Sequence, residues 1–123
     1  MHIRLYVAAV LVGLSVAVFA QADVAGNWRV EFVSPSGDHA VNMTINQNGR
    51  ALTGRVVDEY GEFPAKGTIE GNQITVSWVV PEDGEQVEIV MKGTVAGETI
   101  EGVARLGNIG EGSLSARRVS RNP

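Results

Sequence analysis

The chain has 123 residues, which is enough for one small globular domain and too few for a second full one. It contains no cysteine, and its 10 Lys and Arg against 14 Asp and Glu give a formal net charge of −4. Without cysteine there is no disulfide framework, thiolate metal site or cysteine nucleophile. The acidic balance argues against a nucleic-acid partner, because phosphate backbones are bound by clustered Lys and Arg.

The first 22 residues have the pattern of a secretory signal peptide. Met1 to Arg4 carry a positive charge, residues 5–20 form an apolar run, and Ala20-Gln21-Ala22 places small residues at the −3 and −1 positions of a cleavage site. An uncleaved anchor is the alternative, but the run is shorter than the roughly 20 residues that a spanning helix needs. We therefore expect a signal peptide at 1–22 and a single mature domain at 23–123. The protein would be periplasmic or secreted, with no membrane span after signal cleavage.

The rest of the chain shows period-two alternation of apolar and polar residues, and no stretch has apolar residues at helical spacing over three turns. In the first run, Trp28, Val30 and Phe32 share one face. Asn48-Gly49 favours a tight hairpin, because both residues tolerate positive φ. The predicted strands are 27–33, 39–46, 51–57, 63–70, 73–80, 85–95, 99–105 and 111–119.

The short connections between these strands favour an up-and-down order, and closure of the sheet removes both exposed edges. Several strands carry an inward-facing glycine, which fits a narrow, strongly coiled barrel. These glycines are Gly54, Gly67, Gly93 and Gly102. The outward positions include Arg29, Glu31 and Lys92, the reverse of the apolar band that an outer-membrane barrel needs. The sequence therefore predicts an all-β fold, an eight-stranded antiparallel up-and-down (meander) barrel.

A family resemblance rests on the start of the first strand and the end of the last. Gly26-Asn27-Trp28, together with an arginine near the end of the final strand, resembles the calycin superfamily, which includes lipocalins, fatty-acid-binding proteins, avidins and small barrel inhibitors of bacterial metalloproteases. The stretch 52–55, Leu-Thr-Gly-Arg, is similar to a pattern of avidin-type barrels. The resemblance implies structural roles for Gly26, Trp28 and Arg118, with the indole packed beneath the arginine. Avidins line their pocket with hydroxyl and amide groups, whereas this interior is nearly all aliphatic, so biotin binding is not implied.

The predicted topology brings the same pair together. In a closed eight-strand meander the first and last strands are antiparallel neighbours. The period-two alternation places both Trp28 and Arg118 on the face that points into the barrel. A guanidinium stacked on an indole contributes about 0.5–2 kcal/mol. Arg117 is the alternative partner if a bulge shifts the phase of the last strand.

Alternate turns of a meander lie at the same end of the barrel. The turns at 34–38, 58–62, 81–85 and 106–111 should share the end opposite Trp28, and they contain no Lys or Arg. We call their carboxylates the acidic rim. It consists of Asp38, Asp58, Glu59, Glu62, Glu82, Asp83, Glu85 and Glu111.

Aromatic residues should gather just inside this rim. A mouth lined by aromatic faces and surrounded by carboxylates is suited to a small apolar or cationic ligand. The candidate ligand-binding residues are Phe32, His39, Asp58, Tyr60, Phe63, Trp78 and Asp83. The alternative is a core filled by its own side chains and covered by polar turns.

Other classes of site have weaker support. No D-x-D-x-D-G loop indicates calcium, and we expect neither a metal nor a cofactor. Ser34, Ser36 and His39 are close in sequence, but no G-x-S-x-G elbow accompanies them, so we expect no enzyme. The sequence favours an exported binding module of unknown ligand. The alternative is a periplasmic protein–protein module, such as a protease-inhibitor-like or accessory barrel, acting through the acidic rim or residues 23–25.

Overall fold

A computed structural model of the chain describes residues 21–123. The strands are β1 (Gly26–Ser34), β2 (Gly37–Asn48), β3 (Ala51–Asp58), β4 (Gly61–Glu70), β5 (Gln73–Glu82), β6 (Glu85–Ala96), β7 (Thr99–Leu106) and β8 (Glu111–Ser120), with a short 3-10 helix, η1 (Gly107–Ile109), before β8. The expected signal peptide lies outside the described residues, apart from Gln21 and Ala22. No helix within residues 21–123 is long and apolar enough to cross a membrane.

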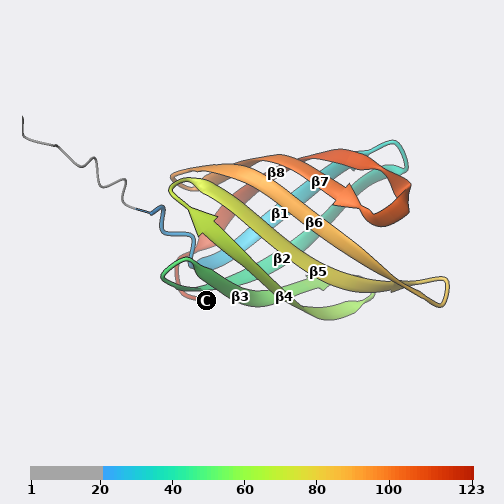
Figure 1. Cartoon of the computed structure of the whole chain (residues 1–123), viewed down its shortest axis with the longest axis horizontal. Coiled ribbons are helices and arrows are strands. Elements are labelled where there is room, and N and C mark those ends of the chain that lie inside the picture. The colour runs from blue at the N-terminus through green and yellow to red at the C-terminus, as the bar shows by residue number, and fades with distance from the viewer. Residues whose placement is uncertain (1–20) are drawn as a thin grey trace, which may run out of the picture.

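The strands form one closed barrel in chain order, and each pairs antiparallel with the next. β8 returns to pair with β1 and completes the ring (Figure 1). Within the described residues, an all-β, eight-stranded antiparallel up-and-down barrel is therefore confirmed.

Several strands extend further than the alternation predicted. The second run was expected over 39–46, but β2 spans Gly37–Asn48, and only Pro35 and Ser36 separate it from β1. Ser34 and Gly37 are register partners in this extension. Backbone pairing continues through polar residues where the alternation of side chains has already ended, so the hairpins at this end are longer and their turns tighter than expected.

The barrel is narrow because neighbouring backbones approach closely at inward glycines. A Cβ atom on Gly54 of β3 would lie 1.8 Å from the carbonyl oxygen of Thr44 on β2. Real Cβ atoms do not come so close to another atom, so only glycine permits this spacing. The coiling that results leaves little space between opposite walls.

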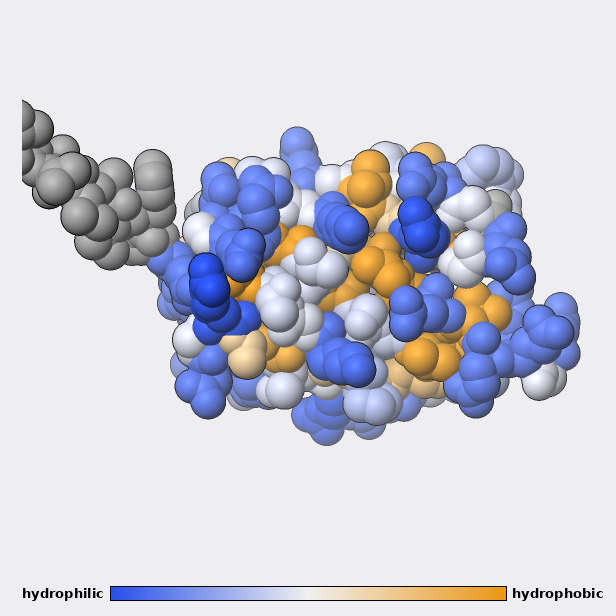
Figure 2. All heavy atoms as spheres, viewed as in Figure 1, coloured by the Kyte–Doolittle hydropathy of each residue, from blue (hydrophilic) through white to orange (hydrophobic). Residues whose placement is uncertain are grey.

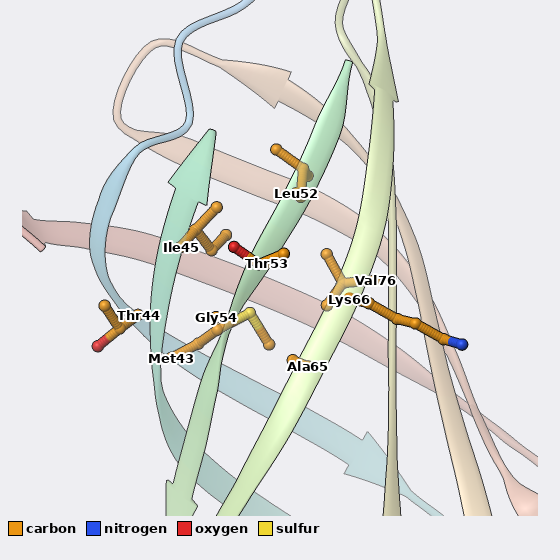
Figure 3. A pocket seen from close by; sticks show the side chains of 9 residues that line it. All are labelled: Met43, Thr44, Ile45, Leu52, Thr53, Gly54, Ala65, Lys66 and Val76. Carbon is orange, nitrogen blue, oxygen red and sulfur yellow. The ribbon is translucent and has the colours of Figure 1, made fainter. Parts of the chain in front are cut away.

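The chain's own side chains fill the interior. Every strand contributes buried apolar residues to a single core. A small hollow beside Gly54, faced by Met43, Leu52 and Val76 among others, has a volume of about 10 Å³ (Figure 3). A space of that size holds about one water molecule at most.

Candidate functional site

The structure brings Trp28 and Arg118 together at one end of the barrel, which we call the closed end. They are register partners on β1 and β8, and the guanidinium carbon lies 4.7 Å from the indole centroid. Both residues are buried, whereas Arg117 is exposed. The register shifts between Asn27 and Trp28, but it is Arg118, not Arg117, that faces the indole.

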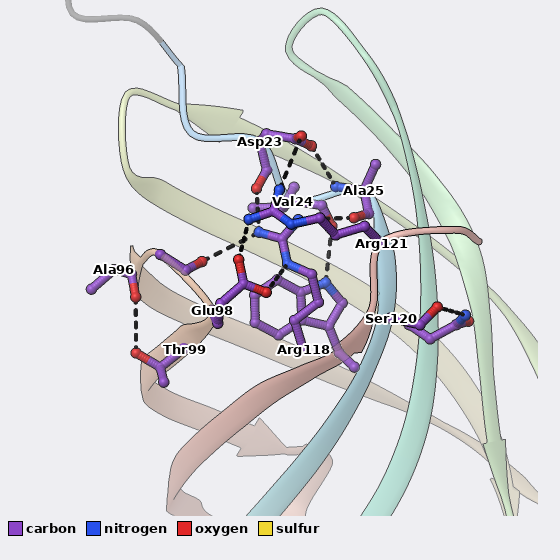
Figure 4. A network of polar contacts seen from close by, with 12 residues as sticks. Asp23, Val24, Ala25, Ala96, Glu98, Thr99, Arg118, Ser120 and Arg121 are labelled. Atoms are coloured by element: carbon purple, nitrogen blue, oxygen red, sulfur yellow. Dashed lines mark hydrogen bonds and ion pairs between the residues drawn. The ribbon is translucent and has the colours of Figure 1, made fainter.

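The Arg118 guanidinium connects the segment before β1 to the β6–β7 turn (Figure 4). Nη1 donates to the carbonyl oxygen of Ala25 at 3.0 Å, and Nη2 donates to those of Asp23 and Gly97. Nε lies 3.3 Å from Oε2 of Glu98, an ion pair whose geometry is not that of a hydrogen bond. A single buried cation thus holds three backbone carbonyls at the closed end.

Residues 22–25, here called the N-terminal arm, cover this end of the barrel. The amide of Ala22 donates to Gly71 O at 2.8 Å. The Gln47 side chain accepts from Val24 N at 2.9 Å and donates to Ala22 O at 3.2 Å. Val24 is fully buried, and its carbonyl accepts a hydrogen bond from Trp28 Nε1. The arm therefore covers the closed end and is bonded to the β4–β5 turn and to side chains of β1, β2 and β8, a role that the sequence analysis missed.

Gly26 stands where the arm enters β1. Its φ is +136°, and a Cβ atom there would lie 2.3 Å from the carbonyl oxygen of Ser120. Only glycine fits both the backbone conformation and the close approach of β8. The Asn27 side chain then donates to Ser120 Oγ at 3.0 Å, which fastens the end of β8 beside the arm.

At the opposite end, the mouth of the barrel is closed by side chains. The Phe32 and Trp78 rings are almost fully buried, with centroids 6.1 Å apart and planes tilted by 48°. Phe63 is half-buried and packs against the same core, together with Ile89 and Leu106. The Trp78 indole forms no hydrogen bond to the described residues, in contrast to Trp28. The aromatic residues expected near the mouth are present, but they occupy the space that a ligand would need.

Three of the other candidate residues are exposed to solvent. His39 is exposed beside its register partner Phe32. Tyr60 is 83% exposed on the β3–β4 turn. Asp83 is exposed on the β5–β6 turn with a φ of +49°, followed by Gly84 at +79°, which fits a tight hairpin. Of these three residues, His39 lies directly beside the buried aromatic pair, whereas Tyr60 and Asp83 lie on turns.

Carboxylates surround Tyr60. Glu59 raises the pKa of the Tyr60 phenol above its usual value, and Asp58 and Glu82 contribute in the same direction. One oxygen of Asp58 also accepts from the amides of Tyr60 at 2.7 Å and Gly61 at 3.1 Å. Asp58 thus shapes the turn that displays the ring, in addition to adding negative charge.

The charge of the acidic rim is only partly offset. Arg55 reaches from β3 to Glu62 at 2.8 Å. No other rim carboxylate forms an ion pair with a described residue. A largely uncompensated acidic surface therefore surrounds an exposed aromatic ring.

Within residues 21–123, no group of three or more His, Asp and Glu side chains is arranged to hold a metal ion. Comparison of the sequence with known protein families gives no match, and a search of curated proteins gives none either. The candidate site therefore has to be interpreted from its own geometry and charge.

Proposed function

We propose that the protein is an exported, calycin-like binding module whose acidic rim binds a basic surface on a partner protein. The observation that carries this proposal is the closed mouth, where Phe32 and Trp78 occupy the place of a ligand. Sites for small molecules are concave and bury most of the ligand. A hollow of about 10 Å³ offers no such site, so binding is assigned to the outer surface.

Charge favours a basic partner. Rim carboxylates such as Glu59, Glu82 and Asp83 are exposed, and most of the rim has no compensating cation among the described residues. Surfaces of one sign accelerate association with surfaces of the opposite sign and select against like-charged partners. Tyr60 adds an exposed aromatic ring, a residue type enriched in protein interfaces. Binding of this kind is salt-dependent, because exposed charges are screened.

The other parts of the proposal rest on separate observations. Export is supported by the apolar run and small-residue cleavage pattern at 1–22. Kinship with calycins is supported by the meander order and by the Trp28–Arg118 stack. No catalytic step is proposed.

A charge-neutralising variant tests the proposal. Glu59→Gln with Glu82→Gln removes two rim charges, and Glu88→Gln with Glu101→Gln removes two exposed charges from the barrel wall. Binding of a fluorescent lysine-rich peptide is measured by anisotropy at low and high salt. We expect the rim variant to bind about tenfold more weakly and the wall variant to stay within about twofold of the unaltered protein. Equal losses in both variants would show general charge attraction and refute a specific rim site.

A second candidate function is the binding of a small organic cation over Tyr60. It is favoured by the 83% exposed ring among three carboxylates, since a cation is attracted to an aromatic face. Tetramethylammonium is a suitable probe. Tyr60→Phe should retain binding and Tyr60→Ala should abolish it, whereas equal binding by both variants would remove this candidate.

A further inference from the structure

The chain has only two lysines, and both lie on one outer face of the barrel. Lys66 of β4 is the register partner of Ser77, and Lys92 of β6 is the register partner of Thr75. Ser77 and Thr75 are two residues apart on β5, so strand geometry places the lysine Cα atoms about 12 Å apart. Their flexible four-carbon side chains can therefore reach one group bound between them.

A shallow depression lies beside these lysines on the outside of β4 and β5. Its volume is about 280 Å³, and it is lined by Lys66, Gly67, Thr68, Thr75 and Ser77. The Lys66 side chain points away from the barrel interior, whereas Ala65 and Val76 face inward (Figure 3). In Figure 2, where β5 and β6 face the viewer, residues of intermediate hydropathy (white) lie between hydrophilic (blue) and hydrophobic (orange) residues. The depression is therefore an open, shallow feature that offers one ammonium group and three hydroxyl groups.

The hydroxyl groups in the depression are not used by the fold. Thr68, Thr75 and Ser77 form no side-chain hydrogen bond to any described residue. By contrast, the hydroxyl of Thr44 donates to Asn27 at 2.8 Å, and that of Thr99 donates to a backbone carbonyl at 3.1 Å. Thr75 and Ser77 are also half-buried. Three neighbouring donors are therefore available to a bound group.

Both lysines at this face are free of ion pairs with described residues. Both ammonium groups are exposed and available to a bound anion. The two acidic residues at the ends of β4 are each neutralised by an arginine of the β2–β3 hairpin, Glu62 by Arg55 at 2.8 Å and Glu70 by Arg50 at 3.5 Å. Lys66 is the charged residue in the lining of the depression, and Lys92 lies beside Thr75, whereas the exposed carboxylates of Glu88 and Glu101 lie farther along β6 and on β7.

We propose that this surface, the lysine–hydroxyl face (Lys66, Thr68, Thr75, Ser77 and Lys92), binds a phosphate group. Phosphate offers several acceptor oxygens and negative charge, which match three hydroxyl donors between two ammonium groups. A soluble phosphate ester and a phospholipid headgroup present the same chemistry. The site is separate from the acidic rim and does not depend on the function proposed for it.

Titration of isotope-labelled protein with inorganic phosphate, followed by NMR, tests the site. We expect saturable shifts in the amides of the lysine–hydroxyl face. Lys66→Gln and Lys92→Gln should each weaken binding about fivefold. Arg29→Gln is the matched control, because it removes one exposed positive charge from β1, and it should leave the affinity unchanged. Shifts that do not saturate, or an equal loss in Arg29→Gln, would overturn the proposal.

Two further measurements distinguish the sources of phosphate. Phosphatidylcholine vesicles with and without phosphatidic acid are sedimented with the protein, and glycerol phosphate is titrated separately. Cosedimentation that requires phosphatidic acid and both lysines supports a lipid headgroup. Saturable binding of glycerol phosphate without cosedimentation supports a soluble ester. Failure in both measurements, or cosedimentation lost equally in Arg29→Gln, contradicts a phosphate site.

Discussion

Arg118 lies over Trp28 with its guanidinium carbon 4.7 Å from the indole centroid, and the two residues are register partners on the last and first strands. The contact therefore sits on the seam where the barrel closes. The same guanidinium holds the N-terminal arm through the carbonyls of Asp23 and Ala25. Closure of the sheet and attachment of the arm are thus coupled through one side chain.

Arg118→Ala should lower the free energy of unfolding by about 2–4 kcal/mol, because it removes charge-assisted hydrogen bonds and the stack on Trp28. Arg118→Lys should recover only part of this loss, since an ammonium cannot reproduce the planar fork. Chemical denaturation measures both effects. Arg117→Ala is the control and should change stability by no more than about 0.5 kcal/mol, because Arg117 is exposed. Equal effects at 117 and 118 would contradict the assignment.

Gln47→Ala should loosen the N-terminal arm. The variant loses the hydrogen bonds to Val24 N and Ala22 O, which together contribute about 1–2 kcal/mol. Amide hydrogen exchange at Val24 should become faster, while the centre of β1 stays protected. Asn46→Ala changes an exposed neighbour and serves as the control. Unchanged exchange at Val24 in Gln47→Ala would mean that the arm is held by other contacts.

Titration of Tyr60 reports on the surrounding carboxylates. Loss of the phenolic proton creates an anion, which nearby negative charges disfavour, so Glu59 raises the pKa of Tyr60. Glu59→Gln should lower that pKa toward its usual value. Ultraviolet titration of protein that starts at Asp23 measures it directly, because Tyr60 is then the sole tyrosine. If Glu101→Gln on the barrel wall lowers the pKa as much, the clustering of rim charge around Tyr60 is wrong.

Trp78→Ala tests whether the mouth is filled by core residues. Removal of a buried indole that packs against Phe32 should cost about 3–5 kcal/mol. Tyr60→Ala, at an exposed position of the same end, should cost no more than about 0.5 kcal/mol. Thermal and chemical unfolding measure both variants. A small loss for Trp78→Ala would indicate an open mouth with room for a ligand.

Much of the fold could be predicted because the alternation of apolar and polar residues shows which side chains face inward, and closure of the barrel then determines which strands are neighbours. The inward positions of Trp28, Val30 and Phe32 follow directly from a period of two. Once eight strands close in chain order, β8 must lie beside β1. Because Trp28 and Arg118 both occupy inward-facing positions, their side chains then meet inside the barrel. The ends of β2 could not be predicted, because its outer residues pair through the backbone and carry no alternation.

The sites were harder to predict, because they depend on contacts between segments far apart in the chain. Val24 precedes the first strand and shows no periodic signal, yet its amide bonds to Gln47 and its carbonyl to Trp28. The number of aromatic residues near the mouth could be read from the sequence. Whether Phe32 and Trp78 line a hollow or fill it depends on barrel radius, which close approaches such as that at Gly54 determine.

The most direct test of the proposed function is native mass spectrometry of the protein purified from its own cells at low salt. We predict that the barrel interior carries no small molecule, and that the protein is found in part as a complex with a basic protein. This complex should dissociate at higher salt and should be reduced in the Glu59→Gln, Glu82→Gln variant. A discrete small-molecule mass that is lost on denaturation but retained in the Lys66→Gln, Lys92→Gln and Tyr60→Ala variants would contradict the filled interior, and absence of a salt-sensitive protein complex would contradict binding through the acidic rim.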